Sequence, residues 1–192
     1  SCSVSENEQS EAQTDEFPSF STSLDLGSNV IVSEVFPCEG LKYVISGKFT
    51  ESFQMGSLKA EAKSGYDGFA LKVNSAGAVE MLLHMVSDGE LNLAGTTTDD
   101  DQNIHLVGSF TGKLSVGFLE IESKGQSDLF ILSWSKDGDL LNLQGIGGGG
   151  DEMVTSASYS DGAIILGGYF SDSFDYGNSQ QSSGGGTDGF VL

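Results

Sequence analysis

Aspartates gather at two places in the sequence, and their carboxylates are well suited to bind a metal ion. One run of three is followed by a glutamine and an asparagine, and a second pair flanks a glycine. Carboxylate and amide oxygens are the ligands that Ca²⁺ takes, although neither place has the ligand spacing of an EF-hand loop. Two interpretations therefore stay open, solvated loop acids or a calcium site, for Asp99, Asp100, Asp101, Asp137 and Asp139.

A further aspartate recurs at one position of an internal repeat, where Asp67, Asp128 and Asp188 each stand just before an apolar run. A carboxylate in such a place accepts hydrogen bonds from backbone N–H groups two residues on and so stabilises a turn. A catalytic group is rarely needed once in every copy of a repeat. We predict that these three residues are structural anchors and not parts of an active site.

The other residues with reactive side chains do not form a catalytic motif. His84 and His105 have no nearby cysteine and lack the spacing of a zinc site. No Gly-x-Ser-x-Gly sequence supplies a serine nucleophile. Residues 145–150 match the Gly-x-Gly-x-x-Gly dinucleotide fingerprint, but no helix is predicted after them, which favours a turn between two repeats. We predict a protein that is not an enzyme and that has no cofactor other than calcium.

Aromatic residues and the charge of the chain bear on its partners. Trp134, Tyr159 and Tyr169 either line a carbohydrate-binding face or pack in the core. The chain has 28 Asp and Glu against eight positive residues, all lysines, and a net charge of -20. Nucleic-acid binding needs clustered cations, and an anionic membrane surface would repel such a chain. We expect an unidentified protein or carbohydrate partner, no nucleic acid, and no membrane contact except through a lipid anchor.

These residues belong to a unit of about 60 residues that occurs nearly three times. Five positions recur, and successive copies are offset by 61 and then by 60 residues. Five positions that keep both offsets indicate a structural repeat. The sets are Gly47, Gly108 and Gly168; Phe49, Phe110 and Phe170; Gly56, Gly117 and Gly177; Asp67, Asp128 and Asp188; and Phe69, Phe130 and Phe190.

Within each unit, short β-branched and aromatic runs alternate with Gly, Asn, Asp and Ser, and no helical period occurs. Four strands per unit are typical of a β-propeller blade, whereas the units of the alternative, a solenoid, are shorter. The predicted fold is therefore all-β, with four-stranded antiparallel blades that form an incomplete propeller. The units are 30–86, 87–146 and 147–192, and the strands of the second are 91–97, 104–111, 129–135 and 140–143.

The first residues differ in composition from the rest of the chain. Residues 1–16 are rich in Ser, Glu and Gln, which predicts a disordered acidic tether before a repeat domain over 17–192. Cys2, followed by this tether, resembles the processed N-terminus of a bacterial lipoprotein, and the resemblance implies that Cys2 carries the lipid. A disulfide between Cys2 and Cys38, or two free thiols, is the alternative.

The repeat also resembles a known family. Its pattern is Gly-x-Phe, then Gly-x-x-Asp-x-Phe, then Gly-Gly-x-Gly-x-Asp, and the second unit carries it best, at 108–110, 125–130 and 147–151. From about residue 30 to 192 it is similar to the SBBP-type β-propeller repeats of bacterial surface and secreted proteins. The first unit departs from the pattern at 86–90, which read Val-Ser-Asp-Gly-Glu. The resemblance implies a binding or scaffold role and brings no catalytic residues.

The sequence thus favours a non-enzymatic binding or scaffold module of the bacterial cell envelope, as an outer-membrane or surface lipoprotein, or alternatively a secreted protein. Propellers close with four to eight blades, and this chain supplies two and part of a third. We therefore expect a fragment of a longer protein or closure by self-association. Two other functions stay open: the accessory propeller of a larger secreted enzyme, and a calcium-stabilised structural domain.

Overall fold

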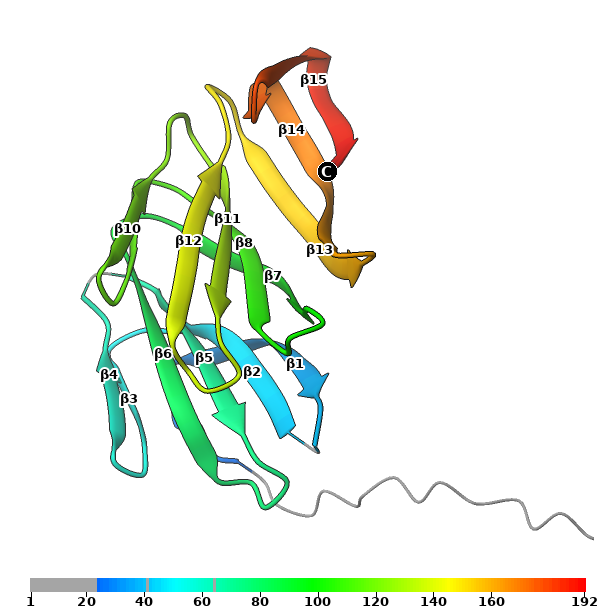
Figure 1. Ribbon diagram of the computed structural model, residues 1–192. Coiled ribbons are helices and arrows are strands. Elements are labelled where there is room, and N and C mark those ends of the chain that lie inside the picture. Colours follow the sequence, from blue (N-terminus) through cyan, green and yellow to red (C-terminus); the bar gives the residue numbers. More distant parts are fainter. Residues whose placement is uncertain (1–23, 41, 64) are drawn as a thin grey trace, which may run out of the picture.

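The computed structural model describes residues 24–40, 42–63 and 65–192, and within these ranges the chain folds into antiparallel β-sheets without a helix (Figure 1). The all-β prediction is therefore confirmed. The described part has no helix that could cross a membrane. The predicted tether, residues 1–16, lies outside the described residues.

The first sheet follows chain order, with each strand antiparallel to the next. Its first four strands are β1 (Val30–Cys38), β2 (Lys42–Phe49), β5 (Asp67–Val73) and β6 (Val79–Ser87), and the hairpin of the second unit adds two more strands beyond β6. Between β2 and β5 the chain forms a separate hairpin of β3 (Ser52–Met55) and β4 (Leu58–Glu61). Every residue of β5 is buried, so both faces of this strand are covered, and its sequence lacks the alternation of a half-exposed strand.

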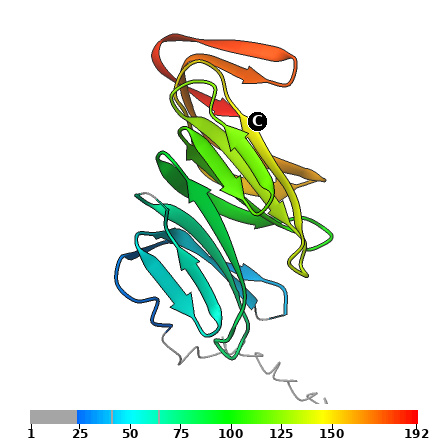
Figure 2. The ribbon, with the colours of Figure 1, turned by 90° about the vertical axis from the view of Figure 1, so that its left-hand side faces the viewer.

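The second unit repeats this arrangement, and the third repeats most of it (Figure 2). The second sheet contains β7 (Leu91–Thr98), β8 (Ile104–Phe110), β11 (Asp128–Trp134) and β12 (Leu140–Ile146), near the four predicted positions. The hairpin of this unit, β9 (Lys113–Val116) and β10 (Leu119–Glu122), belongs to the first sheet. The third sheet contains β13 (Glu152–Ser160), β14 (Ala163–Tyr176) and β15 (Ser179–Val191). The far ends of β14 and β15 pair with each other in the place of the hairpin.

The sequence does not predict the hairpin between the second and third strands of a unit. For the second unit it indicates only a long connection at this place. The hairpin turn requires a positive φ, which a residue without a Cβ adopts readily. Gly56, Gly117 and Gly177 stand at these turns with φ of +61°, +59° and +58°. In the second unit, β9 also pairs with β6 and so covers the edge of the preceding sheet.

The glycine of the Gly-x-Phe pattern allows close packing of three strands. A Cβ added to Gly108 would lie 2.2 Å from the carbonyl oxygen of Asn92 and 2.5 Å from the Phe130 ring. Equivalent contacts surround Gly47 and Gly168. In each sheet the pairing of the first strand shifts register next to this glycine, and the phenylalanine of the third strand lies against it.

Apolar clusters lie on both sides of the second sheet. Towards the first sheet the core contains Phe110, Phe130 and Trp134, and towards the third sheet it contains Leu129 and Phe174. Alternate residues of β11 therefore serve different clusters. A third cluster, which includes Phe49, Phe53 and Phe69, covers the other face of the first sheet.

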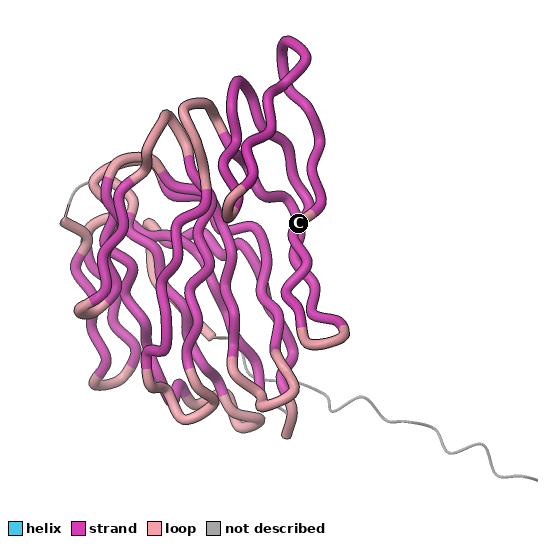
Figure 3. The backbone as a smooth tube through the Cα atoms, turned by 45° about the horizontal axis from the view of Figure 1, so that its top comes forward, coloured by secondary structure: helices cyan, strands magenta, loops and turns pink. Residues whose placement is uncertain are grey.

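The first strands of the three sheets are neighbours, because β7 contacts both β1 and β13. The strands run side by side, and their turns gather at two ends of the molecule (Figure 3). None of the sheets is closed on itself. The two ends present different side chains, and each is a candidate for function.

Candidate functional site

All three units contribute to a groove of about 610 Å³ at the end of the molecule where β7 and β13 begin. This volume lies in the range of small-molecule sites. Its lining includes Lys48 and Tyr66 from the first unit, Glu90 and Asn92 from the second, and Asp151 at the start of the third. These residues are far apart in the sequence, and only the packing of successive sheets brings them together.

The groove offers one aromatic face and several polar groups. Tyr66 is 42% exposed, and the ammonium of Lys48 lies 5.1 Å from the centroid of its ring, a cation–π contact. The side chains of Glu90 and Asn92 are exposed at the groove. Thr111 holds this segment in place, because its Oγ1 accepts a hydrogen bond of 2.8 Å from the backbone N–H of Glu90. A ligand here would meet hydrogen-bond donors, acceptors and a flat apolar ring.

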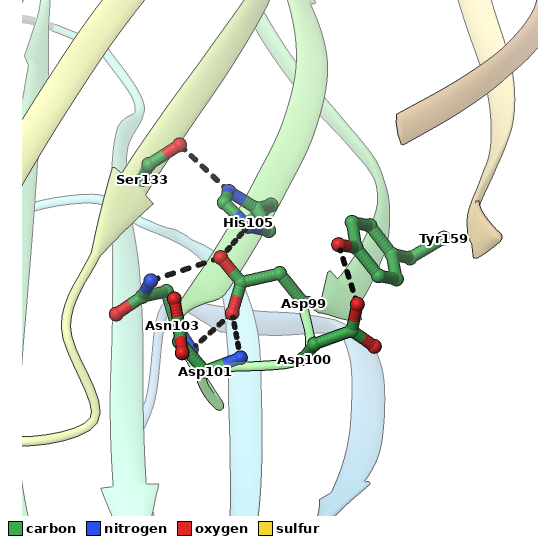
Figure 4. Close-up of polar contacts among 7 residues, drawn as sticks. All are labelled: Asp99, Asp100, Asp101, Asn103, His105, Ser133 and Tyr159. Carbon is green, nitrogen blue, oxygen red and sulfur yellow. Dashed lines mark hydrogen bonds and ion pairs between the residues drawn. The ribbon is translucent and has the colours of Figure 1, made fainter. Parts of the chain in front are cut away.

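The first calcium candidates lie at the opposite end, in the turn between β7 and β8, where Asp99 is already engaged (Figure 4). One carboxylate oxygen accepts the backbone N–H groups of Asp101 and Asn103, at 3.0 and 2.8 Å. The other accepts the Asn103 amide at 2.9 Å and lies 3.3 Å from His105 Nε2. Asp99 therefore organises its own turn.

His105 connects this turn to the neighbouring strand, since its Nδ1 lies 2.7 Å from the hydroxyl of Ser133 in β11. The order carboxylate, imidazole, hydroxyl is that of a serine hydrolase. Ser133 and His105 are each only 8% exposed, however, and they face each other across paired strands. A substrate carbonyl has no open approach to this hydroxyl, so we interpret the three groups as a structural network.

Removal of the Asp99 carboxylate tests that interpretation. Asp99→Ala leaves two backbone N–H groups and the Asn103 side-chain amide without an acceptor, and we expect it to lower the free energy of unfolding by about 1–2 kcal/mol. Asp101→Ala, at an exposed neighbour, is the control and should change it by less than about 0.5 kcal/mol. Equal losses in the two variants, measured by urea denaturation, would contradict a structural role that is specific to Asp99.

The same carboxylate gives a pH dependence. Burial opposes its ionisation, but the hydrogen bonds from Asn103 and the hydrogen bond and charge of His105 outweigh this and lower the pKa of Asp99. A carboxyl group with a lowered folded-state pKa contributes stability above its unfolded pKa, and that stability is lost as the pH falls through the folded value. The acid limb of the stability profile should therefore be flatter in Asp99→Ala than in the unchanged protein.

The other calcium candidates do not meet. Asp100 lies 3.3 Å from the hydroxyl of Tyr159, and Asp101 is exposed. Asp137 and Asp139 are exposed in the turn between β11 and β12. Within residues 24–40, 42–63 and 65–192, no three His, Cys, Asp or Glu side chains are arranged to hold a metal ion. The sequence motif thus corresponds to turn residues on two separate hairpins.

The repeated aspartates lie in the third strand of each unit. Asp67 and Asp128 are the first residues of β5 and β11, and Asp188 lies within β15. Each accepts a hydrogen bond from the backbone N–H of the residue four positions earlier, at 3.2 Å in Asp67 and Asp128 and 2.7 Å in Asp188. The sequence predicts a donor two residues after each aspartate. The observed donor precedes it, so each carboxylate stabilises the turn before its strand and not the residues after it. Asp67 and Asp128 are 0% and 2% exposed, which makes their remaining partners important.

The aromatic residues singled out from the sequence do not share a surface. Trp134 is fully buried in the core, and Tyr159 contacts the turn at Asp100. Tyr169 is 42% exposed on β14, on the third sheet. The aromatic ring in the groove is Tyr66 instead. It occurs in Ser-Gly-Tyr-Asp-Gly, and no periodicity marks it as a binding residue.

Within the described residues Cys38, at the end of β1, has no disulfide partner. Burial, which outweighs the nearby Lys72 charge, raises the pKa of its thiol above the ordinary value. Cys2 lies outside the described residues. Its lipidation, and the alternative disulfide with Cys38, therefore stay predictions.

Comparison with known proteins leaves the chain without a family: no family model matches the sequence, and no curated protein matches it significantly.

Proposed function

We propose that the three sheets are blades of a β-propeller and that the chain is a non-enzymatic binding module. Three features support the propeller: the order of strands within each unit, the contacts of β7 with β1 and β13, and burial on both faces of the second sheet. In a propeller the first strands of successive blades lie around a common axis. The SBBP-like pattern is consistent with the same proposal.

The groove carries the binding proposal, because residues from three successive units line it. Hydroxyl-rich ligands both donate and accept hydrogen bonds, which suits a rim that contains Lys48, Glu90, Asn92 and Asp151. The Tyr66 ring offers a surface on which the apolar face of a sugar can stack. A net charge of -20 disfavours an anionic ligand. We therefore propose a neutral oligosaccharide as the ligand class.

A matched pair of tyrosine variants tests this proposal. Tyr66→Ala removes the stacking surface, and we expect it to weaken binding of neutral oligosaccharides at least about tenfold, a change of about 1.4 kcal/mol. Tyr176→Ala truncates a tyrosine that is 49% exposed on β14 and does not line the groove, and should leave the affinity unchanged. Calorimetric titration of glucose-, galactose- and N-acetylglucosamine-based oligosaccharides measures both. Equal affinities of the two variants, or no binding by the unchanged protein, would refute the proposal.

We also propose a location and a context for this module. A cell-envelope or secreted location fits an acidic, arginine-free binding module, and a lipid on Cys2 would give it a membrane anchor. A role as the accessory propeller of a larger enzyme is compatible with the same groove, which would then hold the substrate polymer near a catalytic domain.

A further inference from the structure

Two carboxyl groups are buried together where the second sheet meets the third. Asp128 and Glu152 are 2% and 0% exposed, and they begin β11 and β13. Both approach Gly147: a Cβ added there would lie 2.4 Å from Asp128 Cγ and 2.6 Å from Glu152 Oε2. The backbone joins the sheets at the same place, since the N–H of Glu152 donates to the carbonyl of Ser127 at 2.7 Å.

Each of these side chains has one buried oxygen without a partner. Asp128 Oδ2 accepts the backbone N–H of Lys124 and Glu152 Oε2 accepts that of Gly148, at 3.2 and 3.0 Å. The other two oxygens, Asp128 Oδ1 and Glu152 Oε1, are buried and accept no hydrogen bond within the described part of the chain. An unpaired buried carboxylate oxygen is costly unless a proton or a cation satisfies it.

The first unit shows what a satisfied version of this site looks like. Asp67 is the equivalent of Asp128, and there both carboxylate oxygens have partners: His84 Nε2 at 2.7 Å on Oδ2 and the backbone N–H of Ser87 at 3.2 Å on Oδ1. At the repeat offset of 61, Gly145 stands in the place of His84 and Glu152 in the place of Leu91. The second unit therefore has no imidazole at this place and has a second carboxyl group instead.

The charges around the pair favour a cation. Asp128, Asp151 and Asp175 all lie near enough to Glu152 to disfavour its ionised form, and burial together with these charges raises the pKa of Glu152 to about 7. Burial also raises the pKa of Asp128, although Lys124 opposes this. The ammonium of Lys124 donates a hydrogen bond to the carbonyl of Gly147 at 3.3 Å and does not bond either unpaired oxygen. Within the described residues, acids surround the two unpaired oxygens, and neither oxygen has a direct cationic partner.

We propose that a calcium ion binds between Asp128 and Glu152 and fastens the third sheet to the second. The two unpaired carboxylate oxygens would be its side-chain ligands, and the peptide oxygens of Gly148 and Gly149 and water would complete the shell. Ca²⁺ accepts such mixed oxygen shells and irregular geometry, whereas Mg²⁺ requires a near-ideal octahedron and keeps its water. This site is distinct from the aspartate turns 99–101 and 137–139, and it does not depend on the groove.

Thermal unfolding of chelator-treated protein, with and without added CaCl₂ at pH 8, tests the site. At a calcium concentration about 100-fold above Kd, binding linkage predicts a rise of roughly 5–10 °C in the melting midpoint. Glu152→Gln and Asp128→Asn should each abolish the rise. Asp137→Asn, at the opposite end of the molecule, is the control and should retain it. Equimolar MgCl₂ should give a smaller rise.

Two results would overturn the proposal. A calcium-induced rise that persists in both Glu152→Gln and Asp128→Asn would place the ion elsewhere. The second is no response to calcium at pH 8. If stability then also falls as the pH rises from about 4.5 to about 7 and loses this dependence in Glu152→Gln, a proton neutralises the pair instead. The reason is that a carboxyl group with a raised folded-state pKa is most stabilising while it is protonated.

Discussion

Gly108→Ala should destabilise the protein by about 3 kcal/mol, because the new methyl group would collide with backbone. The Cβ would lie 2.2 Å from the carbonyl oxygen of Asn92 on β7 and 2.5 Å from the Phe130 ring on β11. Neither strand can move away easily, because both are hydrogen-bonded to β8 and packed between sheets. Overpacking against rigid neighbours costs about 1–3 kcal/mol, with the largest values where backbone must shift.

Gly145→Ala is the matched control for this variant, since Gly145 lies in β12 of the same sheet. A Cβ there would meet no atom closer than 3.6 Å, which is ordinary van der Waals contact. We expect its stability to stay within about 0.5 kcal/mol of the unchanged protein. Chemical denaturation of both variants measures the difference. If the two glycines tolerate alanine equally, the close three-strand packing described for the repeat is wrong.

The second large effect is expected from Phe130→Ala. Phe130 is fully buried between the first and second sheets, where its ring packs edge-on against Phe110 with centroids 6.2 Å apart. Its loss would remove the apolar contacts of a whole ring and leave a cavity, at a cost of about 3–5 kcal/mol. The free energy of unfolding from denaturant titration gives this value directly.

Phe118→Ala removes the same ring from a different environment. Phe118 is 82% exposed at the turn between β9 and β10, and we expect a change below about 0.5 kcal/mol. A loss there as large as in Phe130→Ala would mean that the exposed hairpin is covered in solution, for example by a second copy of the chain. A small loss in Phe130→Ala would contradict its place in the core.

The sequence predicts the strands of the second unit well, because the repeat aligns them and turn residues bound them. It does not predict the β9–β10 hairpin, since strands of four residues leave too short a pattern. Gly117 was visible as a repeated position, but its reason, a turn that needs positive φ, appears only in the backbone. The way the sheets associate depends on contacts between units, which no local pattern encodes.

The candidate sites were predicted less well than the fold. The three consecutive aspartates 99–101 suggest a metal site in the sequence. In the structure Asp99 instead accepts hydrogen bonds from its own turn, and the three carboxylates do not converge. Glu152 looks ordinary in the sequence, and its importance comes from burial beside Asp128, which lies 24 residues earlier. The sequence holds one signal for it. When the repeats are aligned, Glu152 occupies the position of Leu91 in the preceding unit, so an acidic residue replaces an apolar one.

We propose that residues from three successive units form one ligand-binding groove. Amide chemical shifts of ¹⁵N-labelled protein, followed during titration with the tightest-binding neutral oligosaccharide, test it most directly. We expect the amides of Tyr66, Asn92 and Asp151 to shift together and to saturate at one ligand concentration. Shifts confined to the turns 99–103 and 135–139 at the opposite end, or no shifts with any saccharide, would contradict it.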